Sequence, residues 1–140
     1  MATYGNLPVY KQTYDLLLNF FRVSQNMERD YKFTIGESLK KEIIELIVNV
    51  YRANCHTAKV ALIEAARENT EVIRLMLRLL HDLKQIGLKE FVSCNAMLES
   101  VSKQLSAWHR SRINKSDGVE RDVFEGQSPG GLFAFQESAG

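Results

Sequence analysis

The sequence predicts an all-α protein, folded as an up-down-up-down antiparallel four-helix bundle. Three observations lead to this fold class. Apolar side chains recur at helical spacing in four segments between residues 8 and 112, and no segment alternates apolar and polar side chains as a half-buried strand does. Only two prolines occur in 140 residues, so little interrupts long helices. The connections between the segments are short, which places consecutive helices antiparallel.

The first helix is predicted to begin near Pro8, because proline suits the first turn of a helix, and to run to about Met27. Its apolar positions form a core stripe and a second stripe beside it. A surface helix of a monomer usually carries one such stripe. The first helix is therefore apolar over more of its surface than a monomer needs. The core stripe holds Val9, Leu16, Phe20, Val23 and Met27, and the second holds Tyr10, Tyr14, Leu17 and Phe21.

The second helix is predicted to begin at Thr34. Thr34 and Glu37 have the spacing of a capping box, in which each side chain accepts a hydrogen bond from the backbone N–H of the other residue. Gly36 falls inside the predicted first turn, where it is either a tolerated end residue or a point of close approach by a neighbouring segment. The main apolar stripe runs through Ile35, Leu39, Ile43, Leu46 and Val50.

The third helix is predicted from about Thr57 to Ile86, and Gly87 is predicted to end it in a left-handed conformation. The fourth helix is predicted from about Leu88 to Arg112. Because the turn between them is tight, these two helices are expected to be antiparallel neighbours.

Residues 1–112 form the predicted bundle domain, and residues 113–140 form an acidic tail. The bundle region carries 16 Lys and Arg against 12 Asp and Glu, whereas the tail carries 2 against 5. Helical periodicity ends after Ile113, and turn-forming residues dominate residues 114–118 and 127–131. The tail has too few apolar residues to offset the entropy of ordering, so we expect it to be largely disordered. One apolar cluster at residues 132–135 is the only part of it that could pack on the bundle.

The sequence offers no active site, and we expect a protein that is not an enzyme and holds no cofactor or metal. His56, His81 and His109 lie on separate segments without metal-binding spacing. The GxxxxGK[ST], GxGxxG and GxSxG motifs of phosphate binding, dinucleotide binding and hydrolysis are absent.

A cytoplasmic location is expected. No apolar run approaches the ~18 residues of a membrane span, and the first residues lack the pattern of a signal peptide. In a reducing cytoplasm Cys55 and Cys94 are expected to be free thiols, because they lie about 40 residues apart without a CxxC partner.

Basic side chains gather on two helix faces. Arg67, Arg74 and Arg78 share one face of the third helix, and Lys103 and Arg110 share one face of the fourth. One interpretation is a solvated surface with ion pairs, since Glu71 and Asp82 stand three or four residues from these arginines. The other is a basic surface that follows a nucleic-acid backbone and releases counterions as it binds. The five residues are the candidate binding site for a nucleic acid or a polymerase.

Wide apolar cover on the first two helices indicates self-association. In a monomer of this size it would leave a large exposed apolar patch, and such patches usually mark protein interfaces.

A family resemblance rests on three segments in order: residues 31–39 (YKFTIGESL), 74–83 (RLMLRLLHDL) and 104–108 (QLSAW). On these motifs the chain resembles the accessory variability determinant proteins of diversity-generating retroelements, over about residues 8–112. They belong to a wider four-helix-bundle family that includes proteins encoded by intervening sequences of bacterial large-subunit ribosomal RNA genes. Arg74 and Arg78 fall within a matched motif, whereas Arg67, Lys103 and Arg110 come from the helix faces alone.

The resemblance implies a cyclic homopentamer that binds the reverse transcriptase of the retroelement and its RNA, the template-repeat transcript, with DNA as a further candidate. Such a protein supports error-prone, adenine-targeted complementary DNA synthesis without being the polymerase. The alternative is a self-assembling structural protein of the ribosomal-RNA intervening-sequence type, with no defined nucleic-acid role. A neighbouring reverse transcriptase gene with a template/variable repeat pair would separate the two.

Overall fold

The computed structural model describes residues 7–55 and 59–120, apart from the side chains of residues 115–120. Its helices are α1 (Pro8–Ser24), α2 (Arg29–Tyr31), the π-helical turn η2 (Lys32–Gly36), α3 (Glu37–Cys55), α4 (Lys59–Asp82) and α5 (Leu88–Glu120). Because α2, η2 and α3 follow one another without a break, they form one long rod. Within the described ranges there is no β-strand.

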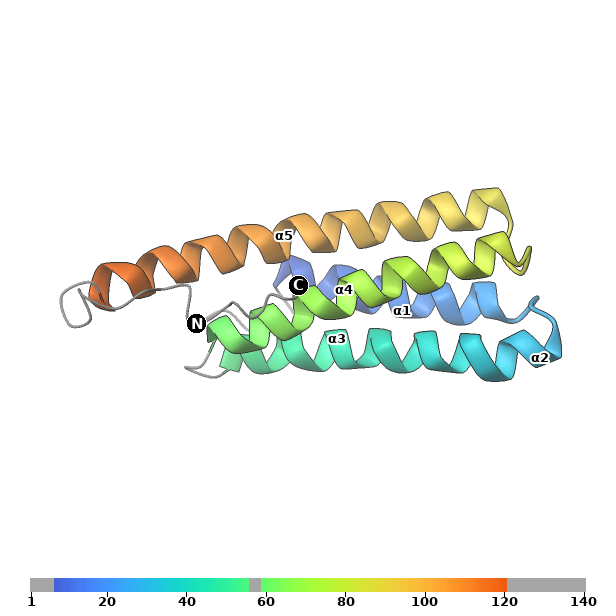
Figure 1. The fold of residues 1–140 in the computed structure, drawn as a ribbon, viewed down its shortest axis with the longest axis horizontal. Helices are drawn as coiled ribbons and strands as arrows, with labels where there is room; N and C mark the ends of the chain where they lie inside the picture. The colour runs from blue at the N-terminus through green and yellow to red at the C-terminus, as the bar shows by residue number, and fades with distance from the viewer. Residues whose placement is uncertain (1–6, 56–58, 121–140) are drawn as a thin grey trace.

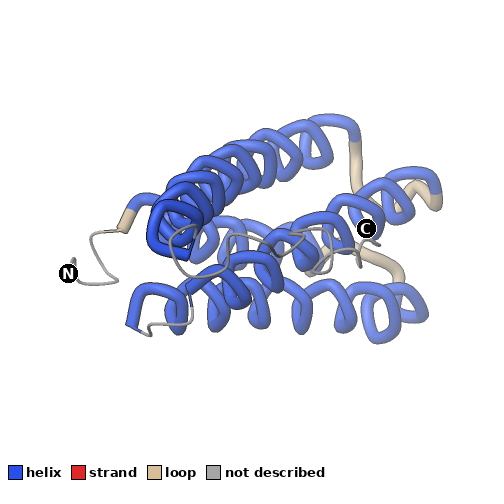
Figure 2. The backbone as a smooth tube through the Cα atoms, turned by 60° about the vertical axis from the view of Figure 1, so that its left-hand side comes forward, coloured by secondary structure: helices blue, strands red, loops and turns tan. Residues whose placement is uncertain are grey.

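The four rods pack as an antiparallel bundle. α1 contacts α3 and α5, and α4 contacts the same two helices, so each rod has two neighbours around a shared core (Figure 1; Figure 2). Successive rods run in opposite directions (Figure 1). The four-helix bundle predicted from the sequence is confirmed.

The core consists of apolar side chains from all four rods. Most of them are aliphatic, and the largest is Phe20. Full burial of one such side chain contributes about 1.5–3 kcal/mol to folding, which makes this interior the main source of stability. All members of the core stripe predicted on the first helix are buried except Val23, which is half-buried. The fully buried members include Leu16, Phe20, Leu39, Ile43, Leu46, Ile63, Ile73, Leu77, Leu80, Leu98 and Leu105.

The predicted capping box at Thr34 is wrong. The rod that contains α3 begins at Arg29, after Glu28 in an extended conformation, so Thr34 lies inside the helix. The Thr34 hydroxyl donates to the carbonyl of Asp30 over 2.6 Å, and Glu37 instead pairs with Lys40 over 3.3 Å. The backbone N–H of Glu37, which the predicted cap would have served, donates to the backbone carbonyl of Thr34 instead.

Gly36 is a point of close approach, the second of the two roles left open by the sequence. It is buried at the end of the π-helical turn. A methyl group at this position would lie 3.2 Å from the Cε atom of Met27 and 3.3 Å from the backbone oxygen of Tyr31. The absence of a side chain therefore allows the chain before α2 to fold against the start of α3.

The turn between α4 and α5 also differs from the prediction, because Gly87 does not end the helix. α4 ends at Asp82, and Lys84 adopts the left-handed conformation with φ of 63°. The N–H of Lys84 donates to the carbonyl of His81 and that of Gln85 to the carbonyl of Leu80, each over 2.9 Å. This is a Schellman motif, in which glycine normally occupies the position of Lys84. The predicted start of the third helix at Thr57 lies outside the described residues.

α5 continues to Glu120, eight residues beyond the predicted end at Arg112. The boundary placed between the bundle and the tail therefore falls within a helix. The turn-forming residues at 114–118 predict the end of the helix. A helix that already exists, however, extends without a new nucleation cost and tolerates residues of low helix propensity. The rest of the tail, with residues 132–135, lies outside the described residues. None of the helices in the described part of the chain is long and apolar enough to cross a membrane.

Candidate nucleic-acid interface

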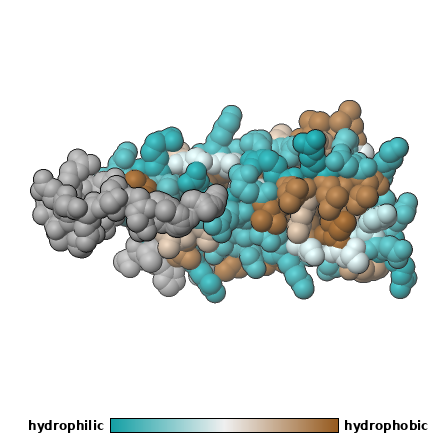
Figure 3. Space-filling model, in the orientation of Figure 1, coloured by the Kyte–Doolittle hydropathy of each residue, from teal (hydrophilic) through white to brown (hydrophobic). Residues whose placement is uncertain are grey.

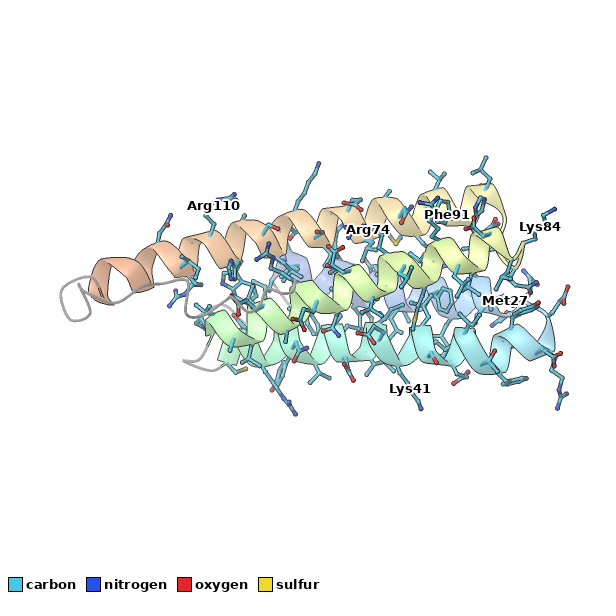
Figure 4. All side chains as sticks on the ribbon, viewed as in Figure 1. Met27, Lys41, Arg74, Lys84, Phe91 and Arg110 are labelled. Carbon is cyan, nitrogen blue, oxygen red and sulfur yellow. The ribbon has the colours of Figure 1, made fainter. Side chains whose placement is uncertain are left out.

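The five predicted site residues lie on the adjoining helices α4 and α5, but their side chains have different surroundings. Arg74 lies between the two helices, and Arg110 projects from the outer side of α5 (Figure 4). α4 and α5 are in contact and run antiparallel, so the two predicted faces lie on neighbouring helices. Whether the positive charge is available there depends on the carboxylates beside each residue.

Arg74 is held by two carboxylates. Its Nη1 atom lies 2.7 Å from Glu71 on the same helix, and its Nε atom lies 2.8 Å from Glu99 on α5. The hydrogen bonds that Arg74 donates to Glu99 and then to Glu71 raise the pKa of Arg74 above its ordinary value. Only 32% of the side chain is exposed. Arg74 therefore ties α4 to α5, as the ion-paired interpretation of the sequence described.

Arg67 is engaged in a second connection between the same helices. Its Nη1 atom lies 3.2 Å from Nδ1 of His109, and Nε2 of His109 lies 3.1 Å from Glu64. A guanidinium can only donate, so Nδ1 accepts and Nε2–H donates to the carboxylate. Arg67 and Glu64 offset each other at this position.

Arg78, Lys103 and Arg110 are the more accessible cations of the candidate site. The Arg78 side chain is 77% exposed, and its Nε atom is 3.9 Å from Asp82, a loose surface pair. Lys103 and Arg110 are exposed, and neither has an ion pair among the described side chains. The structure therefore divides the predicted site into two arginines that join helices and three cations that face solvent.

Sequence reasoning missed Glu99 as the partner of Arg74. Arg74 stands 8 residues before the end of α4, and Glu99 stands 11 residues after the start of α5; Glu64 and His109 stand 18 and 21 residues from the same two helix ends. Both pairs therefore have one register, displaced by three residues from that of positions equidistant from the turn. The tight turn predicts that the two helices are antiparallel, but it indicates this register only approximately.

Large apolar side chains are exposed on two separate parts of the bundle. The first apolar face lies over α1 and α3 and comprises Tyr14, Leu18, Phe21, Ile44 and Tyr51. The second lies over the ends of α4 and α5 that meet at their turn, and comprises Leu75, Leu79, Leu88 and Val92. The second face is visible towards the right of Figure 3. The wide apolar cover predicted for the first two helices is therefore found at the surface.

Sequence comparison supplies the family. No curated protein matches the chain. A family model described as bAvd-like matches residues 7–112, which include almost all of the bundle. The match confirms the assignment to the accessory variability determinant family made from the three motifs, and it indicates a retroelement accessory protein. Because the match spans well over half of the sequence, the chain belongs to the bAvd-like family.

Proposed function

We propose that the protein is a non-catalytic accessory subunit of a diversity-generating retroelement, which binds the reverse transcriptase and the template-repeat RNA and supports mutagenic complementary DNA synthesis in the cytoplasm. The observation that carries this proposal is the family match over residues 7–112, since it covers the bundle rather than one short motif. No cofactor or catalytic residue has a part in the proposed role.

The charge on α5 supports the nucleic-acid part of the proposal. Lys103 and Arg110 are exposed on one helix face, seven residues apart. Arg78 on the adjoining α4 adds a third accessible cation. Such side chains bind phosphates through charge and read little sequence. Affinity should therefore fall steeply with salt, and each lost phosphate contact should lower the slope of log affinity against log salt by about 0.7 for single strands.

The two apolar faces support assembly into a closed ring, and the family resemblance favours a pentamer. The face over α1 and α3 and the face over α4 and α5 belong to different helices. Contact between two different faces of neighbouring copies is heterologous, and such contacts close into rings when the rotation permits. A ring would repeat the cations of α5, so that individually weak phosphate contacts would add.

A matched pair of double variants tests the nucleic-acid surface. Lys103→Glu/Arg110→Glu changes the charge of α5, and Lys41→Glu/Arg52→Glu makes the same change at exposed positions of α3. Co-expression with the neighbouring reverse transcriptase and its RNA, followed by affinity capture, should recover both partners with the wild type and the α3 variant but not with the α5 variant. Light scattering on the same samples must show an unchanged particle size. Equal capture by all three proteins would refute the assigned surface.

The intervening-sequence alternative is favoured by one observation. Two of the five candidate cations join helices: Arg74 is balanced by two carboxylates, and Arg67 contacts His109. A purely structural bundle would need no more than this. Under that alternative the protein forms its ring but captures neither RNA nor a reverse transcriptase, and no reverse transcriptase gene or repeat pair lies beside its gene.

A further inference from the structure

Phe33 is an exposed aromatic residue flanked by two cations. It lies in the π-helical turn η2 and is 58% exposed. The guanidinium carbon of Arg29 lies 5.7 Å from the centre of its ring, and the Nζ atom of Lys32 lies 5.8 Å from it. Both distances are within the range of cation–π attraction. The ring and the two charges thus form one surface cluster.

The fold does not use this ring for its core. Tyr31 and Ile35, on either side of Phe33, pack against the core, whereas Phe33 does not. Phe33 stands two residues from each of them, which in a helix turns its side chain away from theirs, and π-helical turns such as η2 are frequent at functional sites. An exposed phenylalanine gains nothing from hydrophobic burial.

The backbone beneath the ring is firmly held. The Thr34 hydroxyl bonds the carbonyl of Asp30, and the backbone N–H of Glu28 donates to Oε1 of Gln85 over 2.9 Å. Met27 closes against Gly36 on the buried side. The aromatic face is therefore presented on a fixed support, which limits the entropy lost when a ligand stacks on it.

A third cation stands at the same end of the bundle. The hydrogen bond between Glu28 and Gln85 joins the start of α2 to the α4–α5 turn, and exposed Lys84 precedes Gln85. Lys84 and Met27 lie at this end in Figure 4. Lys84 occupies a left-handed position that glycine would fill with less strain. A strained residue of this kind is consistent with a function for its side chain.

We propose that Phe33 stacks an unpaired base of single-stranded RNA, while Arg29 and Lys32 contact the adjacent phosphates and Lys84, at the same end of the bundle, contacts a phosphate farther along the strand. An aromatic ring bordered by cations matches the base and the phosphate of one nucleotide. A protein anchor would be expected among apolar neighbours, but charged residues border Phe33. Because Glu28 and Asp30 lie in the same turn, stacking rather than net charge supplies most of the affinity. The inference rests on the proposed RNA binding but concerns a different surface from the cations of α5.

The test uses the full-length protein and a single-stranded RNA of about 12 nucleotides that carries one 2-aminopurine, within the length range of known single-strand sites. Stacking quenches the fluorescence of this base. Phe33→Ala should remove the quenching and weaken binding about tenfold or more, given the energy of one base stacked on an aromatic ring. Phe33→Trp should preserve both. Phe33→Leu keeps an apolar side chain without an aromatic face, so it should behave like the alanine variant.

Three outcomes would overturn the inference. Quenching that survives in Phe33→Ala would place the base elsewhere. A leucine variant that binds like the wild type would show that apolar area, not stacking, matters. Loss of reverse transcriptase capture with unchanged RNA binding would make Phe33 a protein contact. Failure of this inference is distinguishable from failure of the proposed function. If Lys103→Glu/Arg110→Glu abolishes RNA binding and the Phe33 variants do not, only the inference about Phe33 fails. A wild-type protein without affinity for RNA would overturn both the inference and the proposed RNA binding.

Discussion

Arg74 of α4 and Glu99 of α5 meet across the two helices, with the Nε atom of the arginine 2.8 Å from the carboxylate. The pair therefore reports the antiparallel register of the two helices. It also withdraws one arginine from the basic surface predicted by the sequence. Reversal of Arg74 would bring three carboxylates together, so this residue is unsuited to a test of binding and suited to a test of folding.

Arg74→Glu is expected to lower the free energy of unfolding by about 1–2 kcal/mol, because partly exposed ion pairs contribute about 0.2–1 kcal/mol and like charges add repulsion. The double variant Arg74→Glu/Glu99→Arg should recover most of the loss by restoring opposite charges. Urea unfolding followed by circular dichroism measures both.

Arg78→Glu is the control for this experiment. Its side chain is far more exposed and its pair with Asp82 is long, so the free energy of unfolding should change by no more than about 0.5 kcal/mol. A swap variant no more stable than Arg74→Glu alone would contradict the role given to the cross-helix pair.

Gly36→Ala is expected to destabilise the fold by about 1 kcal/mol, even though alanine is the better helix former. The new methyl group would press on Met27 and on the backbone oxygen of Tyr31, and the backbone cannot move as a side-chain end can. Gly87→Ala is the matched control, since its methyl group would meet only the flexible carboxylate of Glu90. In thermal unfolding experiments, only Gly36→Ala should have a lower melting temperature than the wild type. Equal melting temperatures would show that Met27 and the π-helical turn adjust freely.

Lys84→Gly is expected to stabilise the protein by about 0.5–1 kcal/mol, because glycine adopts the left-handed conformation without the strain of a side chain. The same change should weaken binding of single-stranded RNA, if Lys84 contacts a phosphate as inferred. Chemical denaturation and an RNA titration on one sample measure the two effects together. A variant that is less stable than the wild type would show that the left-handed strain is compensated by contacts of the Lys84 side chain.

Cys94 should react with thiol reagents much more slowly than Cys55, which is exposed. Burial raises the pKa of the Cys94 thiol, with a small opposing effect from the hydrogen bond donated by Asn19 over 3.3 Å. A thiol whose pKa is raised on folding binds its proton more tightly in the folded state. Its contribution to stability is therefore present below the ordinary thiol pKa of about 8.5 and is lost as the pH rises through the folded-state pKa.

The check is labelling by an aromatic disulfide at pH 8. The reagent should modify Cys55 quickly, and Cys94 only at the rate at which the bundle opens. Replacement of Cys94 by alanine should leave the fast phase intact and remove the slow one. Two fast phases in the wild type would place Cys94 in contact with solvent.

The sequence predicted the helices and most of the core, because a helix repeats every 3.6 residues and the repeat is visible locally. It predicted their ends poorly. Thr34 and Glu37 have the spacing of a cap, but Gly36 lets Met27 fold back, and the helix starts five residues earlier, at Arg29. Gly87 is the usual residue for a left-handed stop. Lys84 takes that role instead. The chain turns at Lys84 so that Ile86, two residues later, can pack in the core, where it is 5% exposed.

The candidate site was predicted less well than the fold, for a related reason. Helical spacing placed Arg67, Arg74 and Arg78 on one face, but it carries no information about the opposite helix, where Glu99 and His109 lie. Charge on a face is local information, whereas its neutralisation depends on tertiary contacts.

The π-helical turn Lys32–Gly36 also makes this region the place where the rod can lose a residue without a change of phase. A π turn contains about one residue more than an α turn, so deletion of a single residue here would restore an ordinary α-helix. The parts of the rod before and after the turn would keep nearly the same rotation about the helix axis, because one full turn would replace another. A deletion within α3 itself has no such reserve and would rotate everything before it by about 100° relative to the rest, since each residue of an α-helix turns the chain by that amount. The position of Met27 relative to the core side chains of α3 therefore depends on the residue count of α3 more than on that of the turn.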